Sequence, residues 1–200
     1  TCTVAMAGGA DVRACDVRKG DVLADGRSTV ECVVKVRIDA PTARLVRFKS
    51  GLLISRYHPI RLPESDGSAA GPWVFPCDAP LSLVDDFDAR LPQIDSGDAF
   101  VYSLILRRES DTEPTETAAG IVVDGISVAP FAHDCNPAAA TKHDTDGALP
   151  HAFFGSRATV IEALRQRDGG CAYDAGCVIV DRLVRDSDSQ LIVGLETSAQ

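Results

Sequence analysis

The chain has 200 residues, of which 45% are apolar, and this suits a single domain with a sizeable core. Its 29 acidic residues outnumber 20 basic ones for a net charge of −9, and no lysine or arginine cluster stands out, so nucleic-acid binding is not expected. No apolar stretch is long enough to span a bilayer and no signal-peptide pattern occurs, so we expect a soluble, cytoplasmic monomer without membrane contact.

The seven cysteines are an odd number and lack the paired CxxC spacing of a structural zinc site. At least one thiol is therefore expected to be unpaired. Cys32 lies in the apolar run VECVVKV and is expected to be a small buried side chain. Cys171 and Cys177, in the glycine-rich GGCAYDAGC, are close enough in sequence to staple a loop, but an intracellular setting would keep them reduced.

Short β-rich runs separated by dense turn signals dominate the chain. We expect strands at about residues 30–36, 45–48, 52–55, 73–75, 100–106, 121–123, 126–129, 178–184 and 191–195. This pattern predicts an all-β fold. The polar segments 107–118 and 134–150 are predicted to be loops that contribute nothing to the core.

One helix is predicted at 156–167, where Val160, Ile161 and Leu164 recur at helical spacing after Ser156 in a capping position. Beyond the helix, CVIVDRLV and QLIVGL flank the polar turn RDSDS, which predicts a closing β-hairpin beside the helix. We therefore assign residues 1–155 to the core and residues 156–200 to a helix and hairpin of the same domain.

The stretch GLLISRYHPIRL at residues 51–62 gives the clearest indication of chemistry, because an apolar strand runs into Ser55 and His58. A hydroxyl that holds a carbonyl and an imidazole that protonates a leaving amide nitrogen both assist an amide-to-thioester rearrangement. A thiol for that reaction is present at the N-terminus as Cys2. The pattern predicts self-processing, and the alternative is that His58 is a strand-end histidine bonded to backbone.

Short landmarks follow one another through nearly the whole chain: CTVAMAGG, DVRKGDVL, VECVVKV, GLLISRYHPIR, GPWVFPCD, VYSLIL, GISVAPFAHD and HAFFGS. In this order they resemble the Vint domain, the branch of the Hint (hedgehog/intein) superfamily attached to von Willebrand factor A modules. The resemblance implies a compact, horseshoe-like all-β fold and cleavage of the peptide bond before a cysteine by N-to-S acyl shift. It implies no cofactor and no metal, and a substrate that is the upstream polypeptide of the same chain.

Position by position, the resemblance places SRYH on the family's Thr-x-x-His block, so Ser55 replaces the threonine and His58 protonates the leaving nitrogen. His133 in PFAHD matches the histidine of a Thr-Leu-Gly-His-Gly segment, and His151 matches another family histidine. The expected catalytic set is therefore Cys2, Ser55, His58 and His133. For His133 and His151 the alternative is a structural histidine bonded to turn backbone.

The chain departs from the family pattern at several positions. Cys2 falls on a threonine-like position four residues after the intein nucleophile, so the nucleophile is either Cys2 or a cysteine upstream of Thr1. A family histidine is replaced by Ala119 and a frequent carboxylate by Ser103. The terminal His-Asn of inteins falls on residues 129–130, Ala and Pro, so cleavage without full splicing is expected.

Two other functions stay open at this point. The first is a degenerate, non-catalytic Hint domain that serves as an interaction or spacer module, with Trp73 and Phe75 on a partner surface unless they pack in the core. The second is metal binding through His133, Cys135 and His143 with the neighbouring Asp134 and Asp144, although an alanine-rich loop of solvated polar residues explains these equally well.

Overall fold

The computed structural model describes residues 2–38, 43–62, 73–91, 99–107, 120–132, 153–154, 156–166, 169–188 and 192–197. Within these ranges the chain forms fourteen strands and two α-helices, with short 3-10 turns at 7–9, 14–16 and 76–78. The predicted loop at 134–150 and all but Arg107 of the loop at 107–118 lie outside the described residues. No helix in the described ranges is long and apolar enough to cross a membrane.

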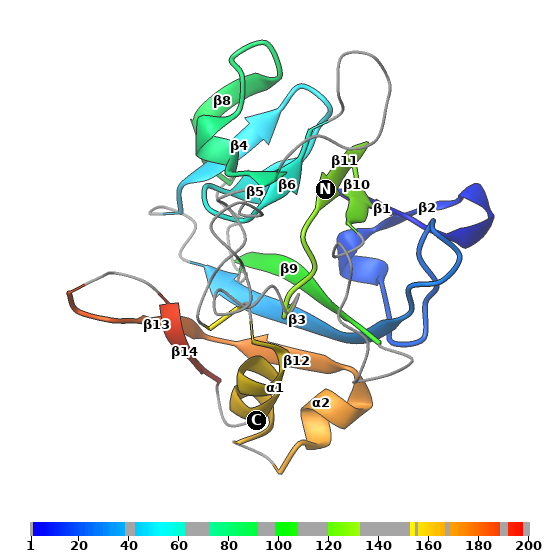
Figure 1. Cartoon of the computed structure of the whole chain (residues 1–200), viewed down its shortest axis with the longest axis vertical. Helices are drawn as coiled ribbons and strands as arrows, with labels where there is room; N and C mark the ends of the chain where they lie inside the picture. The colour runs from blue at the N-terminus through cyan, green and yellow to red at the C-terminus, as the bar shows by residue number, and fades with distance from the viewer. Residues whose placement is uncertain are drawn as a thin grey trace, which may run out of the picture.

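The described strands form several sheets (Figure 1). The largest has the order β2-β1-β10-β11-β6-β7, with strands Asp11–Arg13, Thr3–Ala5, Ile121–Val123, Ile126–Val128, Ile60–Arg61 and Trp73–Val74. A second sheet has the order β12-β3-β9, with strands Cys177–Val180, Val30–Ile38 and Ala99–Leu106. A third has the order β5-β4-β8, with strands Leu53–Ser55, Leu45–Phe48 and Val84–Ala89, and β13 (Arg182–Arg185) pairs with β14 (Ile192–Glu196).

Strand β3 separates two hydrophobic cores. It pairs antiparallel with β9 and parallel with β12, and its valine-rich sequence favours such a buried central strand. The side chains of Cys32, Val34 and Val36 lie in the core that includes the helices. Val30 and Val33 lie in the other core, with residues of β1, β9 and β10.

Helix α1 (Arg157–Arg165) covers one face of this central sheet. It begins where predicted, because the Ser156 hydroxyl accepts a hydrogen bond from the Thr159 amide at 3.4 Å and so caps the first turn. Val160 and Leu164, four residues apart, are buried against the sheet. The predicted helix is therefore confirmed, with the spacing of its apolar residues as its physical basis.

Helix α2 (Cys171–Ala175) is short and was not predicted from the sequence. It occupies the glycine-rich segment interpreted above as a loop, and it is bounded by Gly170 and Gly176, whose φ angles are +93° and +91°. Glycine reaches this left-handed region without strain, so it both begins and ends the helix. Cys171 and Cys177 are both exposed and are not joined to each other.

The all-β prediction is confirmed, and one predicted strand needs correction. The run 178–184 is two strands, because the chain turns at Asp181: β12 joins the central sheet beside β3, and only β13 forms the closing hairpin with β14. Of the aromatic pair, Trp73 packs inside, 3% exposed under the guanidinium of Arg61, 4.6 Å from its ring centroid. Phe75 is half-buried and its ring contacts the exposed ring of Tyr57 edge-on. Cys32 is fully buried, as predicted.

A third core underlies the segment that carries Ser55 and His58. It is built from buried apolar residues of β4, β5, β6, β8 and β11, among them Phe48, Ile54 and Ile60. Cys2 packs against this core from the N-terminal segment. The core thus brings the N-terminus of the chain next to strand β5.

Gly176 and Gly51 provide a matched test of packing at a left-handed position. Both have φ above +90°, but a Cβ at Gly176 would lie 2.4 Å from Cβ of Lys19, whereas a Cβ at Gly51 would meet nothing within 4 Å. Gly51→Ala should cost about 1–2 kcal/mol from backbone strain alone. Gly176→Ala should cost at least about 1 kcal/mol more because of overpacking, as measured by urea unfolding. Equal losses in the two variants would contradict this packing.

Candidate functional site

The thiol of Cys2 lies against the backbone of strand β5. Its sulfur accepts a hydrogen bond from the amide of Leu53 at 3.3 Å and donates to the carbonyl oxygen of Leu53 at 3.6 Å. Leu53 therefore presents both of its backbone groups to this one side chain. The residue at the N-terminus is held in place although the two positions are 51 residues apart.

Asp124 fixes the residue that follows Cys2. Its Oδ1 accepts hydrogen bonds from the Thr3 amide at 3.0 Å and the Thr3 hydroxyl at 2.8 Å. Its own amide donates to the Thr3 carbonyl at 2.9 Å. Asp124 and Gly125 form the turn between β10 and β11 with φ of +46° and +78°, the left-handed pair typical of tight hairpins. The start of β1 is thus clamped by a turn of the same sheet.

The surroundings of Cys2 disfavour its thiolate. Burial raises the pKa of the Cys2 thiol, the Leu53 amide lowers it, and the negative charge of Asp124 raises it further, so that the pKa lies above the ordinary cysteine value. Oδ2 of Asp124 is buried and accepts no hydrogen bond from the residues that the structure describes. At neutral pH the Cys2 thiol keeps its proton, and any nucleophilic attack needs a base to remove it.

Ser55 ends strand β5 and His58 follows it in a tight turn, closed by the His58 amide donating to the Ser55 carbonyl at 3.3 Å. The imidazole Nε2 lies 2.8 Å from the carbonyl oxygen of Ala129. Because a carbonyl only accepts hydrogen bonds, Nε2 carries the proton and Nδ1 of the neutral ring keeps its lone pair. Burial lowers the pKa of His58 and outweighs the opposite effect of the Ala129 carbonyl.

The structure brings three of the predicted site residues to one short strand and its turn. Cys2 contacts the backbone of the first residue of β5, Leu53, and Ser55 stands two residues further along the same strand, about 6–7 Å from Leu53. His58 follows three residues later. Its carbonyl partner, Ala129, is the position on which the resemblance places the terminal histidine of inteins.

The structure describes only some of the other residues singled out from the sequence. Ser103 lies within β9 opposite Val34. The candidates His133, Cys135, His143 and His151, together with Ala119, lie outside the described residues. In the ranges that the structure does describe, no three side chains of His, Cys, Asp or Glu gather as metal ligands would.

Leu53 and Asp124 are parts of the site that were not predicted from the sequence. The Asp-Gly dipeptide at 124–125 is a recognised signal for a tight hairpin turn and would have located that turn. No sequence signal, however, indicates that this carboxylate reaches Thr3, because the two residues are 121 positions apart.

Comparison with known proteins places the chain in a family. Among curated proteins no significant match exists. The model of the Vint family, described as a Hint domain, matches residues 1–194, which include the N-terminal segment, the Ser55–His58 turn, both helices and most of the closing hairpin. Since the match spans nearly the whole chain, this protein belongs to the Vint family of Hint domains.

Proposed function

We propose that this domain processes its own chain. It breaks the peptide bond before a cysteine at its N-terminus by N-to-S acyl shift, and the thioester is then resolved by water or another nucleophile. The observation that carries the proposal is the buried imidazole of His58, held through Nε2 at 2.8 Å from the Ala129 carbonyl oxygen, in the turn that follows the strand holding the Cys2 thiol. Membership of a Hint family agrees with an autoprocessing role.

The reaction needs only groups of the chain itself. Nδ1 of His58 accepts the thiol proton, and the sulfur attacks the carbonyl carbon of the preceding residue to form a C–S bond. The Ser55 hydroxyl donates a hydrogen bond to the resulting oxyanion. As the C–N bond breaks, the proton on Nδ1 moves to the departing amide nitrogen, which leaves a thioester upstream and a free amine on the cysteine.

The lowered pKa of His58 favours both proton transfers of this reaction, one to the ring and one from it. A ring that is neutral at pH 7 is ready to accept the thiol proton. Once protonated in its buried position, the ring is a stronger acid than an exposed imidazolium and gives the proton readily to the amide nitrogen. His58 therefore accepts the thiol proton and then passes it to the leaving amide nitrogen.

Asp124 acts in this scheme as a positioning residue. Its three hydrogen bonds with Thr3 hold the residue immediately after Cys2, and so limit the positions that the scissile bond can take. The same carboxylate disfavours a free thiolate at Cys2, so the thiol keeps its proton until a base removes it. Neither Ala129 nor Pro130 carries a side-chain amide that could cyclise, so the proposal stops at N-terminal cleavage.

The test is a reporter fused ahead of the domain in two versions, one with only Thr1 and Cys2 at the junction and one with the natural upstream residues. We expect dithiothreitol to accelerate release of the reporter, followed by mass spectrometry. Release from the short fusion assigns Cys2 as nucleophile, and release from the longer fusion alone assigns an upstream cysteine. Absence of release from both fusions would contradict autoprocessing.

His58→Ala should slow release from the active fusion by about 10²–10⁴-fold, because it removes the proton relay. Tyr57→Ala is the matched control: Tyr57 is 67% exposed in the same turn and takes no part in the scheme. Circular dichroism spectra of both variants establish that they fold. Cleavage by His58→Ala at the rate of the Tyr57 variant would contradict the assigned role.

The role of Ser55 is tested by a pair of substitutions. Ser55→Ala should reduce the cleavage rate by about 10²–10³-fold, the usual effect of removing one oxyanion donor. Ser55→Thr keeps the hydroxyl and restores the family residue, so it should retain most of the rate. If both variants cleave equally fast, the hydroxyl does not hold the oxyanion.

His58 also predicts how stability depends on pH. Its pKa is lower in the folded chain than the ordinary value of about 6.5, so the folded state disfavours protonation. Its contribution to stability is therefore fully present above pH of about 6.5 and is lost as the pH falls through the folded pKa. We expect the free energy of unfolding of the wild type to fall relative to His58→Gln between about pH 7.5 and pH 5.

His58→Gln is a suitable reference because its amide still donates to Ala129 but does not titrate. Denaturant unfolding at each pH gives the difference between the two proteins, in which the effects of the other acidic groups cancel. A difference that stays constant, or that grows in favour of the wild type on acidification, would show that His58 is not held in its neutral form.

A further inference from the structure

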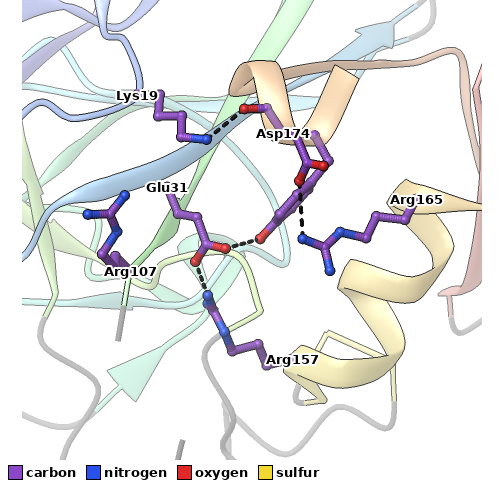
Figure 2. Close-up of a pocket in the computed structure, with 7 residues that line it drawn as sticks. Lys19, Glu31, Arg107, Arg157, Arg165 and Asp174 are labelled. Carbon is purple, nitrogen blue, oxygen red and sulfur yellow. Dashed lines mark hydrogen bonds and ion pairs between the residues drawn. The ribbon is translucent and has the colours of Figure 1, made fainter. Parts of the chain in front are cut away.

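A cavity of about 410 Å³ lies beside the two helices (Figure 2). In Figure 1 these helices lie on the other side of β3 and β9 from β5, the strand that ends at Ser55. Its wall carries four cationic side chains, which are Lys19, Arg107, Arg157 and Arg165. The carboxylates in the same wall belong to Glu31 and Asp174. A wall with two more positive than negative charges is unexpected in a chain whose net charge is −9.

A β-bulge in strand β3 directs Glu31 into this cavity. Val30 stands opposite Leu106 of β9 and Cys32 opposite the adjacent Ile105, so Glu31 is the additional residue of the bulge. The bulge interrupts the alternation of side chains, and Glu31 points to the helix side together with Cys32. The carboxylate there contacts side chains of α1 and α2 (Figure 2).

Both oxygens of Glu31 are used by partners within the wall. Oε1 accepts a hydrogen bond from the hydroxyl of Tyr173 at 2.7 Å, and Oε2 forms an ion pair with Arg157. Burial and the hydrogen bond to Glu31 raise the pKa of Tyr173, so its hydroxyl keeps its proton. Arg157 is 12% exposed and also donates to the carbonyl of Leu106 at 2.8 Å. The charges of Glu31 and Arg157 thus neutralise each other, and hydrogen bonds hold both side chains in place.

The second carboxylate is also neutralised by a neighbour. Oδ1 of Asp174 lies 3.2 Å from Nη2 of Arg165, whose guanidinium stacks on the ring of Tyr173 at 4.6 Å from the centroid. The side-chain charges of Glu31 and Asp174 therefore cancel those of Arg157 and Arg165. The positive charges that remain belong to the other two cations of the wall.

Lys19 and Arg107 supply this surplus. The ammonium of Lys19 donates to the main-chain carbonyl of Asp174 at 2.6 Å, a neutral acceptor, and it has no carboxylate partner among the residues that the structure describes. The guanidinium of Arg107, at the end of β9, forms no ion pair or side-chain hydrogen bond with the residues that the structure describes, and it is exposed. Figure 2 shows the two side chains on the same side of the cavity, next to Glu31.

We propose that this cavity binds a phosphate-type oxyanion. The two positive charges that no described carboxylate neutralises match the charge of about −1.5 to −2 of a phosphate monoester near pH 7. Arg107 offers a planar fork of donors and Lys19 a compact charge, the two groups that commonly hold phosphate oxygens. The cavity is within the size range of small-molecule sites, and its fixed Glu31 network lowers the ordering cost of binding.

The proposal is tested by calorimetric titration of the domain with inorganic phosphate and with phenyl phosphate, with ionic strength held constant by sodium chloride. Arg107→Gln should weaken binding about tenfold, or about 1.4 kcal/mol, and Lys19→Gln should have a similar effect. Arg107 is the decisive position because its side chain forms no hydrogen bond or ion pair in the described part of the chain, whereas Lys19 packs over Gly176.

Arg47→Gln is the matched control, since Arg47 is an exposed arginine in β4, in a different sheet. It should bind phosphate as the wild type does. Tighter binding of phenyl phosphate than of inorganic phosphate would identify the ligand as a phosphorylated small molecule. Equal binding of the two would identify it as the free anion. Failure of both anions to bind, or equal weakening by Arg47→Gln and Arg107→Gln, would overturn the proposal. These outcomes are independent of whether the domain cleaves its own chain.

Discussion

The pairing of β3 with β9 on one side and β12 on the other is the constraint on which the rest of the structure depends. Eight pairs of residues join β3 to β9, and the strand is buried along most of its length. Because successive side chains of a strand point to opposite faces, β3 supplies two cores at once. One face carries the helices, and the other carries the sheet that begins with the N-terminal strand.

The β-bulge at Glu31 interrupts the alternation of side chains in β3 and so places a carboxylate next to the helices. In a regular strand, Glu31 would share a face with Val33 and would meet an apolar core, where an unpaired carboxylate is strongly disfavoured. The additional residue directs it instead to Arg157 and Tyr173. The bulge in β3 thus keeps a carboxylate out of one apolar core and places it in the charged wall of the cavity.

The candidate site is assembled from three separate parts of the chain, and each has its own physical support. The N-terminal segment contacts β5 through the Cys2 thiol, β5 stands on the third core, and the β10–β11 turn clamps Thr3. His58 is fixed by the strand end before it and by the carbonyl of Ala129. Positioning of this kind, rather than a lowered thiol pKa, is what the site contributes to the proposed reaction.

Local patterns in the sequence predicted the elements that are determined by interactions between residues close together in the chain. The Ser55–His58 turn follows from an apolar strand that ends in polar residues, and α1 follows from the spacing of Val160 and Leu164. Strand β8 was missed because its sequence VDDFDA is too acidic to resemble a strand, and only pairing with β4 selects that conformation. The Asp124 clamp and the bulge at Glu31 depend on contacts with distant partners, which the local sequence does not encode.

The most direct measurement of the central claim is the mass of the reporter released from the longer fusion in the presence of hydroxylamine. An N-to-S acyl shift produces an activated thioester, and hydroxylamine attacks its carbonyl and displaces the thiol. We predict that the released reporter ends in a hydroxamate. A reporter that ends only in a free carboxylate under the same conditions, or that stays attached, would contradict a thioester intermediate at this site.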